Sequence, residues 1–526
     1  MHEKYGPIVR INPHEIHVYD STWLDTLYTG PAYGKRDKYP PTAYMTGTPR
    51  GIFGTVSHDL HRLRRSAINP LFSKSGAAAA VPMIYEHTEK LFTRMKSQIT
   101  RNGFTEMRAN FLAFTTDNVS LYSTGKSRDL LDDEYLADEW KMSIGKLAEW
   151  TLIGRHFSWV IPTVLEMPMA LIRLILPEFS RIDMRELASY YVQTTSNTEN
   201  PKSKSIGSTN VFRMILSNEQ MPPSEKVTNR ISHEGVVAIA AGGETTARAF
   251  TVALFFILSD KGTIQEKLKK ELEQVMPDPY SRPSLKELES LPWLSAIIKE
   301  SLRIMALPTT RFPLVSPSEP LRYQEWVIPA GTPVSMTLRD VLLDTKIYKE
   351  PFDFQPQRWL STNPDLDKLN KYHVPFGRGN RMCIGVNLAY AELYVGLACI
   401  FRRLELELHD TTRERDIDIA RDCFIGEPSP STKGWPKLDV LVFDIFYDNY
   451  DLNTAHHKVD LPVLLVDYGK ASSVVRKTSH EFSEIVNVHV ATQHNYHGWN
   501  AKPPYFEDQT GHNPPKYENP RDATML

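Results

Sequence analysis

The stretch Phe376-Gly-Arg-Gly-Asn-Arg-Met-Cys-Ile-Gly385 decides how this sequence is interpreted. It is a glycine-rich loop that presents one thiol, Cys383, just before a segment with the apolar spacing of a helix. Gly377 and Gly379 permit backbone angles that a side chain would forbid. A place near a helix N-terminus and beside Arg381 favours the thiolate form of Cys383, and a thiolate is a soft metal ligand.

Two other interpretations of this loop are weaker. A single cysteine is most often a small buried hydrophobic residue. A dinucleotide-binding glycine loop would follow a strand and would carry a third glycine where Met382 stands. Both interpretations lose support once the whole ten-residue string is considered.

The composition is that of an ordinary globular protein. The chain has 526 residues, 41% of them hydrophobic and 24% charged, with a formal net charge of −2. These values exclude a wholly disordered, collagen-like or coiled-coil protein, and they argue against one built mainly to hold nucleic acid. Cys383, Cys399 and Cys423 are too few for a disulfide framework, which suits a reducing compartment. No apolar run reaches the roughly 18 to 20 residues that cross a bilayer.

The hydrophobic periodicity predicts a mainly α fold with small β-sheets. Short strands are expected in the first forty residues and again over 321–333, and strand-like patterns recur at 438–447 and 459–466. The tail from residue 494 is rich in Pro, Asn, Asp and His and is expected to be disordered. The clearest helices are predicted over 224–259, which should be buried, over 284–305, and after Gly385.

Two of these helices carry patterns that break local rules. Glu300 and Arg303 are three residues apart and share a helix face, although an exposed pair of this kind contributes little. The string Ala241-Gly-Gly-Glu-Thr-Thr246 lies in the middle of the most apolar helix. Each glycine there costs about 1 kcal/mol, and a buried Glu244 needs a partner. Such a pattern is typical of a functional site; a helix kink packed by small residues is the alternative.

The ten-residue string matches the haem-binding signature F-x-x-G-x-R-x-C-x-G of the cytochrome P450 family at every defined position, and the chain resembles that family. The matching residues are Phe376, Gly379, Arg381, Cys383 and Gly385. By this resemblance, Cys383 is the metal ligand, the axial thiolate of haem iron. The resemblance covers residues 1–434, which would form the haem domain. It is closest to fungal secondary-metabolism members of the trichodiene-oxygenase-like group.

The resemblance also implies roles for residues outside the loop. Glu300 and Arg303 resemble the family's E-x-x-R motif and would form a buried structural triad with Arg358. In the groove over the haem, Thr245 would hydrogen-bond dioxygen and Glu244 would help to relay protons. The propionate contacts would be His61, Arg65 and Arg311, and the substrate pocket would include Val237, Ala238, Ala241, Val315 and Phe424.

The implied activity is that of a haem-thiolate monooxygenase. It would insert one oxygen atom of dioxygen into a small apolar secondary metabolite, a terpenoid above all. Because the chain carries no recognisable flavin or nicotinamide domain, electrons would come from a separate NADPH-cytochrome P450 reductase. Two alternatives stay open at this point. One is a haem-thiolate isomerase or dehydratase that needs no external electrons, and the other is a truncated product without catalytic activity.

Two departures from the family pattern stand at the ends of the chain. Family members carry a membrane anchor before the segment that resembles His2-Glu-Lys-Tyr-Gly-Pro7 and reside in the endoplasmic reticulum membrane. The chain as written has no anchor, so it is expected to be soluble or to contact membranes peripherally. Residues 435–526 would be an atypical, partly disordered C-terminal extension. Trp435 stands where a closing strand is expected, which puts one wall of the substrate pocket in doubt.

Overall fold

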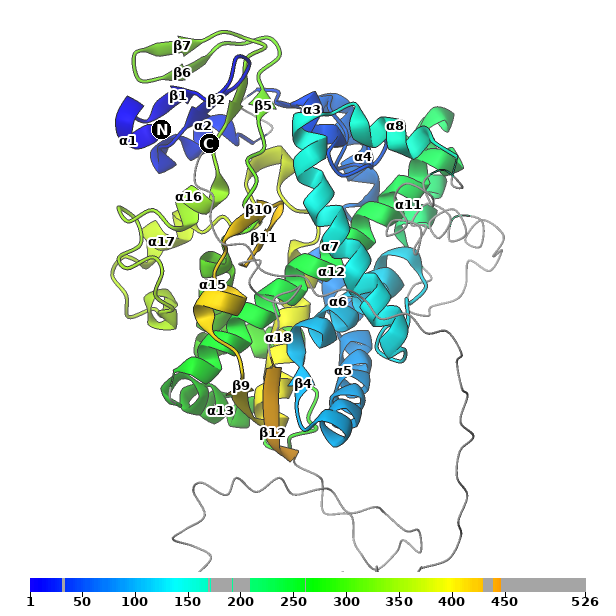
Figure 1. Ribbon diagram of the computed structural model, residues 1–526, viewed down its shortest axis with the longest axis vertical. Coiled ribbons are helices and arrows are strands. Elements are labelled where there is room, and N and C mark those ends of the chain that lie inside the picture. The colour runs from blue at the N-terminus through cyan, green and yellow to red at the C-terminus, as the bar shows by residue number, and fades with distance from the viewer. Residues whose placement is uncertain are drawn as a thin grey trace, which may run out of the picture. The chain divides into compact units, whose positions relative to one another are not determined.

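The computed structural model describes residues 1–30, 34–168, 171, 192, 209–260, 262–428 and 439–445. Helices dominate these residues and the sheets are short, which confirms the predicted mainly α fold (Figure 1). The helices that do not recur below are α1 His2–Tyr5, α2 Leu24–Leu27, α3 Pro40–Tyr44, α4 His58–Ile68, α11 Val211–Ser217, α13 Thr263–Val275, α16 Leu338–Leu342 and α17 Leu366–Tyr372. Short 3₁₀ turns cover Ser21–Trp23 and Pro223–Glu225, and a π-helical turn covers Arg413–Ile417.

The long helix predicted over 224–259 is α12, Thr228–Ser259, and most of its length is buried. It packs against α6, Met107–Thr124. The two glycines of its central string allow this close contact. A Cβ atom on Gly243 would lie 2.5 Å from Thr116 Oγ1, and one on Gly242 would lie 2.6 Å from Val119 Cγ2. The two glycines lower the helix propensity of α12, but their lack of side chains lets α6 pack closely against it.

The single helix predicted over 284–305 is wrong in one respect, because the structure divides it into two. Helix α14, Leu285–Glu289, begins with a capping box between Ser284 and Glu287. Helix α15, Pro292–Met305, begins with proline at its first position. Proline lacks the N–H that would continue a helix from the preceding turn, so Pro292 ends one helix and starts the next.

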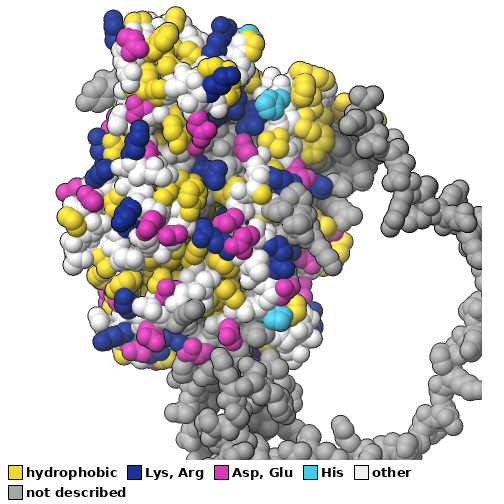
Figure 2. All heavy atoms as spheres, turned by 60° about the vertical axis from the view of Figure 1, so that its left-hand side comes forward, with side chains coloured by type: hydrophobic (Ala, Val, Ile, Leu, Met, Phe, Trp, Pro, Cys, Tyr) yellow, Lys and Arg dark blue, Asp and Glu magenta, His cyan; other side chains and the backbone are white. Residues whose placement is uncertain are grey.

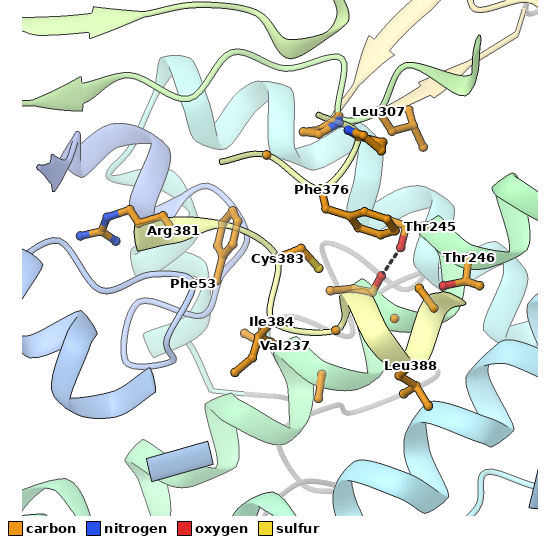
Figure 3. Close-up of a pocket in the computed structure, with 18 of the residues that line it drawn as sticks. Phe53, Val237, Thr245, Thr246, Leu307, Phe376, Arg381, Cys383, Ile384 and Leu388 are labelled. Carbon is orange, nitrogen blue, oxygen red and sulfur yellow. Dashed lines mark hydrogen bonds between the residues drawn. The ribbon is translucent and has the colours of Figure 1, made fainter. Parts of the chain in front are cut away.

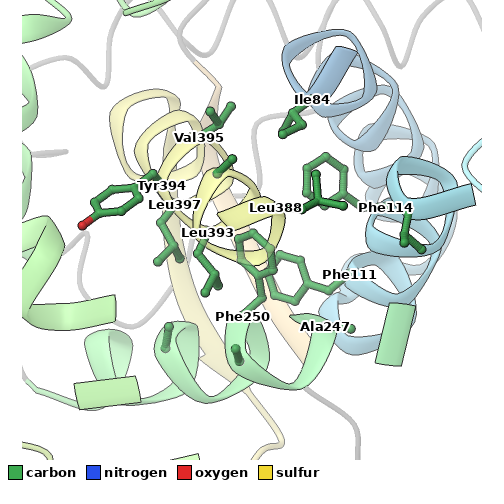
Figure 4. Packing of buried hydrophobic residues seen from close by; sticks show 14 of the residues in the cluster. Ile84, Phe111, Phe114, Ala247, Phe250, Leu388, Leu393, Tyr394, Val395 and Leu397 are labelled. Atoms are coloured by element: carbon green, nitrogen blue, oxygen red, sulfur yellow. The ribbon is translucent and has the colours of Figure 1, made fainter. Parts of the chain in front are cut away.

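Helix α18, Val386–Arg403, confirms the helix predicted after Gly385 and lies in the main hydrophobic core. It packs against α12 and against α5, Lys74–Asn102. Phe250 of α12 stacks on Phe111 of α6 at 4.9 Å between ring centroids, and Phe114 meets the same ring edge-on at 5.8 Å. Figure 4 shows these rings beside the leucines of α18. The helix that follows the cysteine loop is thus held by dense packing.

Four small sheets lie beside the helices in the described part of the chain. A five-stranded sheet has the order β1-β2-β8-β5-β3, with a parallel pairing only between β2 and β8. Its strands are Ile8–Arg10, Ile16–Val18, Pro333–Ser335, Leu314–Val315 and Asp37–Lys38. Two hairpins are formed by β6 Leu321–Tyr323 with β7 Trp326–Ile328 and by β10 Arg421–Cys423 with β11 Ile425–Glu427. The strands predicted in the first forty residues and over 321–333 are therefore confirmed.

The strand predicted over 438–447 is present as β12, Asp439–Ile445. It pairs antiparallel with β9, Leu404–His409, and with β4, Thr105–Glu106. This sheet thus continues past residue 434, the end that the sequence suggests for the main domain. The strand predicted over 459–466, the tail from 494 and Trp435 lie outside the described residues.

Glu300 is fully buried on α15 and connects this helix to the short turn Pro356–Trp359. Its carboxylate accepts two hydrogen bonds from Arg303, at 2.9 and 2.8 Å, and one from Arg358 Nε at 3.1 Å. Trp359 Nε1 donates to the same carboxylate at 2.8 Å. The structure therefore brings the three predicted triad residues together. A buried charge of this kind is tolerated because every oxygen has a partner.

The surface mixes charges of both signs. Lys and Arg side chains alternate with Asp and Glu over the face shown in Figure 2, in keeping with a net charge near zero. None of the described helices combines the length and the apolar character that crossing a membrane requires.

The triad generates a stability prediction. Replacing Glu300 with Gln removes the carboxylate that pairs with both Arg303 and Arg358, so the free energy of unfolding should fall by about 3–5 kcal/mol. Thermal unfolding followed by circular dichroism would measure it. Glu134→Gln is the matched control, because Glu134 pairs with Arg101 at the surface and should change the unfolding temperature little. An equal effect of the two substitutions would contradict the central role of Glu300.

Candidate functional site

A cavity of about 350 Å³ lies between α12, the loop before α18 and the turn between β10 and β11. Its volume falls within the range of small-molecule and cofactor sites. Figure 3 shows Cys383, Thr245 and Phe376 around it. Most of the residues predicted for the site line this cavity, namely Val237, Ala238, Ala241, Thr245, Phe376, Arg381, Cys383, Gly385, His61 and Phe424.

The loop that carries Cys383 is shaped by its backbone. Gly379, with φ of 75°, lies so close to a neighbouring segment that a Cβ atom would be 2.5 Å from the carbonyl oxygen of Thr29. The backbone N–H of Cys383 donates to the Phe376 carbonyl at 2.9 Å, which closes the loop. A Cβ atom on Gly385 would have the Cys383 sulfur as its nearest neighbour, at 4.0 Å. The loop therefore leaves space beside the thiol.

Burial raises the pKa of the Cys383 thiol, while the Gly385 N–H and the nearby Arg65 act in the opposite direction. The prediction that Arg381 favours the thiolate is wrong. The Arg381 guanidinium donates to the carbonyls of Thr55 and Val56 at 2.8 and 2.6 Å, and Figure 3 shows it pointing away from the sulfur. Coordination of a metal ion would deprotonate the thiol outright.

Four basic groups gather at one side of the cavity. Arg65 donates to the Met382 carbonyl at 2.6 Å, and His61 and Arg381 line the cavity together with Lys38. Burial and the neighbouring Arg381 and Arg65 lower the pKa of His61 to about 2, so its ring is neutral. Within the described part of the chain, neither arginine nor the lysine is ion-paired with a carboxylate. Haem carries two propionates and an iron that binds thiolate, so these residues fit haem.

Two of the predicted site residues, Arg311 and Val315, lie outside the described lining of the cavity for the same reason. Arg311 forms an ion pair with Glu15 at 3.1 Å, and neither Arg311 nor Val315 belongs to the described lining of the cavity. Phe312 and Leu314 line it instead. Side chains alternate between the two sides of an extended chain, so the segment that leads into β5 presents only every second residue. Arg311 and Val315 therefore both lie outside the described lining, on the side of the segment opposite to Phe312 and Leu314.

Phe424 forms a wall of the cavity at the turn between β10 and β11. Its φ of 70° is rare for a residue with a side chain. Asp422 stabilises the turn by accepting hydrogen bonds from Thr309 and Thr310 at 2.8 and 2.6 Å, and from Arg155 at 2.9 Å. This wall, which the sequence puts in doubt, is present in the structure.

Thr245 and Glu244 are neighbours on α12 but face different surroundings. Thr245 lines the cavity and donates to the Ala241 carbonyl at 2.8 Å (Figure 3). Glu244 is buried outside the described lining and accepts a hydrogen bond from Arg108 at 2.6 Å. Burial lowers the pKa of Arg108, but Glu244 and Glu427 outweigh it and raise that pKa. A step of one residue rotates a helix face by about 100°, so Glu244 is not a direct proton donor to the cavity.

Sequence reasoning missed several ionisable residues in the described lining, among them Lys38, Glu234, Arg378 and Glu392. Glu392 lies on α18; burial raises its pKa well above the usual value, while the nearby side chains of Asn118 and Thr246 act in the opposite direction. An acid within an otherwise apolar helix, nine residues after Cys383, is a signal that could have revealed it. Lys38 lies in a two-residue strand and gives no such signal.

Comparison with known proteins agrees with this geometry. The family profile described as Cytochrome P450 matches residues 1–433. The chain is 38% identical to the cytochrome P450 monooxygenase sdnE of Sordaria araneosa, over 82% of this chain and 86% of that protein. It is 36% identical to the cytochrome P450 monooxygenase TRI4 of Trichoderma arundinaceum (81% and 82% covered) and to the N-acetyltryptophan 6-hydroxylase of Emericella nidulans (82% and 85% covered).

The alternation of side chains in the segment that leads into β5 predicts different effects for substitutions at two neighbouring positions, Leu314 and Val315. Leu314→Ala should weaken the binding of 4-phenylimidazole to the haem-loaded protein by about fourfold or more, the loss expected for one buried methylene contact. Val315→Ala should leave the dissociation constant unchanged, because Val315 lies outside the lining. Absorption titration of both variants measures the two constants. A larger effect of Val315→Ala would show that the strand faces the other way.

Proposed function

Because the chain belongs to the cytochrome P450 family, we propose that this monooxygenase oxidises an apolar secondary metabolite, with a terpenoid as the favoured class. The observation that carries the proposal is the apolar cavity that is lined by both an accessible Cys383 thiol and the Thr245 hydroxyl. We further propose that electrons come from a separate NADPH-cytochrome P450 reductase at the endoplasmic reticulum membrane.

The chain supplies the groups that would hold haem. Cys383 would ligate the iron, and His61, Arg65 and Arg381 would face the propionates, since neutral imidazole N–H and guanidinium groups donate well to carboxylates. Haem bound through this thiolate would supply the activation of dioxygen that oxygen insertion requires.

The remaining walls select the substrate and exclude water. Phe53, Val237, Leu307 and Phe424 present apolar surface to the cavity, and burial of an apolar skeleton against such walls is favourable by about 25 cal/mol per Å². Pocket shape rather than hydrogen bonding would then determine which carbon is oxidised. Two relatives are named as hydroxylases of N-acetyltryptophan and of tryptophan, so an aromatic skeleton also suits such a site.

Thr245 is the proton-handling group of the cavity. Its hydroxyl donates to the Ala241 carbonyl one turn earlier, and rotation about χ1 would turn the O–H towards a cavity ligand. Glu244 acts through structure: its bond to Arg108 anchors this turn of α12 to α6. We therefore assign Thr245 as a catalytic residue and Glu244 as a positioning residue.

Exposed aromatic side chains support a peripheral membrane contact. Phe157 and Trp159 are 55% and 67% exposed between α7, Glu134–His156, and α8, Val160–Glu166. Aromatic residues of this kind favour the membrane interface. Trp159→Ser should reduce co-sedimentation with phospholipid vesicles, whereas Trp326→Ser, at another exposed aromatic position, should not. Equal loss in both variants would speak against a contact at this site.

The reduced, carbon-monoxide-bound absorption spectrum tests the haem-thiolate site. The wild-type protein should show a fully red-shifted Soret band, and Cys383→Ser should lose that shift, because serine supplies no thiolate. Cys399→Ala is the control, since Cys399 is buried in α18 away from the cavity. A wild-type protein without any haem band would overturn the proposed function and favour a non-catalytic product.

Thr245→Ala tests proton handling. NADPH oxidation should continue with a reductase present, but product formed per NADPH should fall roughly tenfold or more and hydrogen peroxide should rise. Thr251→Ala is the matched control: Thr251 donates to the Ala247 carbonyl in the same way but lies outside the described lining. Turnover without NADPH consumption would instead indicate an isomerase or dehydratase.

A further inference from the structure

Glu234 is a buried carboxylate in the wall of the cavity. It lies on α12 about three helical turns before Thr245 and is 3% exposed. Both of its oxygens are engaged inside the protein. Oε1 lies 2.7 Å from Arg230 Nη2, and Oε2 accepts a hydrogen bond from the backbone N–H of Ile52 at 2.9 Å. The role of this carboxylate is therefore to be found in the groups that it already binds.

The Ile52 N–H belongs to a segment, residues 51–55, that forms part of the cavity wall. Ile52 and Phe53 line the cavity, and Figure 3 shows the Phe53 ring beside it. That ring meets Phe312 and Phe424 edge-on, with 6.0 Å between the centroids in each pair. None of the five residues lies in a helix or strand. Because no regular ladder of backbone bonds fixes this wall, its position depends on individual contacts.

The segment lies close against α12. A Cβ atom on Gly51 would lie 3.2 Å from both the His233 carbonyl oxygen and Val237 Cγ2, so glycine at this position permits the approach. The Thr55 hydroxyl donates to the Gly51 carbonyl at 2.8 Å and closes the turn. This close fit brings the N–H of Ile52 within hydrogen-bonding distance of a side chain on α12.

A buried network of charges stands behind the segment. Arg230 pairs with Glu225 at 3.0 Å as well as with Glu234. Arg64 donates to both oxygens of Glu225, at 2.7 and 2.9 Å, and to the Thr55 hydroxyl at 2.8 Å. Two arginines and two carboxylates balance one another, which makes their burial tolerable. The network therefore holds the segment at two points, through Glu234 and through Arg64.

We propose that Glu234 is a positioning residue that controls how a ligand fits the cavity, because its bond to the Ile52 N–H holds Ile52 and Phe53 in the wall. The inference rests on the proposed monooxygenase function and deepens it. The carboxylate is engaged by the protein, so this end of the cavity selects an apolar body by its shape and not by a charge. A ligand that extends beyond the iron would meet the wall, whereas one confined to the iron would not.

The test compares two ligands of the haem-loaded protein, imidazole and the longer 4-phenylimidazole, by absorption titration. Glu234→Met removes both acceptor oxygens and keeps the length of the side chain, while Arg230 retains Glu225. This variant should weaken 4-phenylimidazole about tenfold or more relative to imidazole, the loss expected when one apolar side chain leaves the wall. Glu234→Gln should restore the wild-type ratio, because its amide carbonyl still accepts the Ile52 N–H.

Glu271→Met is the matched control. Glu271 is also a buried carboxylate that accepts backbone N–H groups, those of Trp293 and Leu294 at 2.9 Å each, but it lies outside the described lining. Its replacement should lower the unfolding temperature and leave the ratio of the two dissociation constants unchanged. Amide hydrogen exchange, followed by mass spectrometry, reports on the segment directly. Exchange within residues 51–55 should accelerate about tenfold or more in Glu234→Met and stay unchanged in Glu271→Met.

An unchanged ratio in Glu234→Met would overturn the proposal, and so would a ratio shifted as strongly in Glu271→Met or in Glu234→Gln. Unchanged exchange of residues 51–55 would overturn the route through the Ile52 N–H. The carbon-monoxide spectrum separates these results from a failure of the proposed function. A wild-type protein without the red-shifted band would refute that function, and hydrogen exchange alone would then decide whether Glu234 holds the segment.

Discussion

The buried carboxylate of Glu300 is the interaction on which the cysteine loop depends. It binds Arg303, Arg358 and the Trp359 indole, so α15 and the segment around 356–359 form one rigid unit. The Trp359 ring lies 4.7 Å from that of His373, whose Nε2 bonds to the Lys299 carbonyl of α15. Three residues after His373 the cysteine loop begins. A network of charges inside the protein thus fixes the position of a thiol that takes no part in it.

The cavity divides into a polar and an apolar part. The polar part holds the thiol of Cys383 with the buried cations Lys38 and Arg381, and the apolar part holds Phe424 and the side chains of α12. Such a division fits a cofactor that has a charged edge and a metal centre and that lies beside an apolar substrate. Two buried acids, one on α12 and one on α18, also differ in their surroundings. Glu244 forms an ion pair with Arg108, whereas Glu392 lies in the lining and burial raises its pKa.

The sequence predicted the class of fold, most of the long elements and the thiol, because these depend on periodicity and on one local string. It failed where a function depends on the side of a strand or helix that a residue occupies. Arg311 and Val315 are each one position away from the residues that line the cavity, and Glu244 is one helix step from Thr245. Lys38 could not be predicted, because a lysine in a two-residue strand is normally exposed and only tertiary packing buries it.

The basic groups around the cavity also connect ligand binding to stability. Burial disfavours the charged forms of Lys38 and Arg381 and lowers both pKa values, although Asp37 partly offsets the effect on Arg381, so the burial of these two groups costs folding free energy. A bound dianion that contacts the native state alone would remove this cost and would add its own binding free energy to folding. These cations would therefore favour a carboxylate-bearing cofactor, and folding and cofactor binding would become parts of one equilibrium.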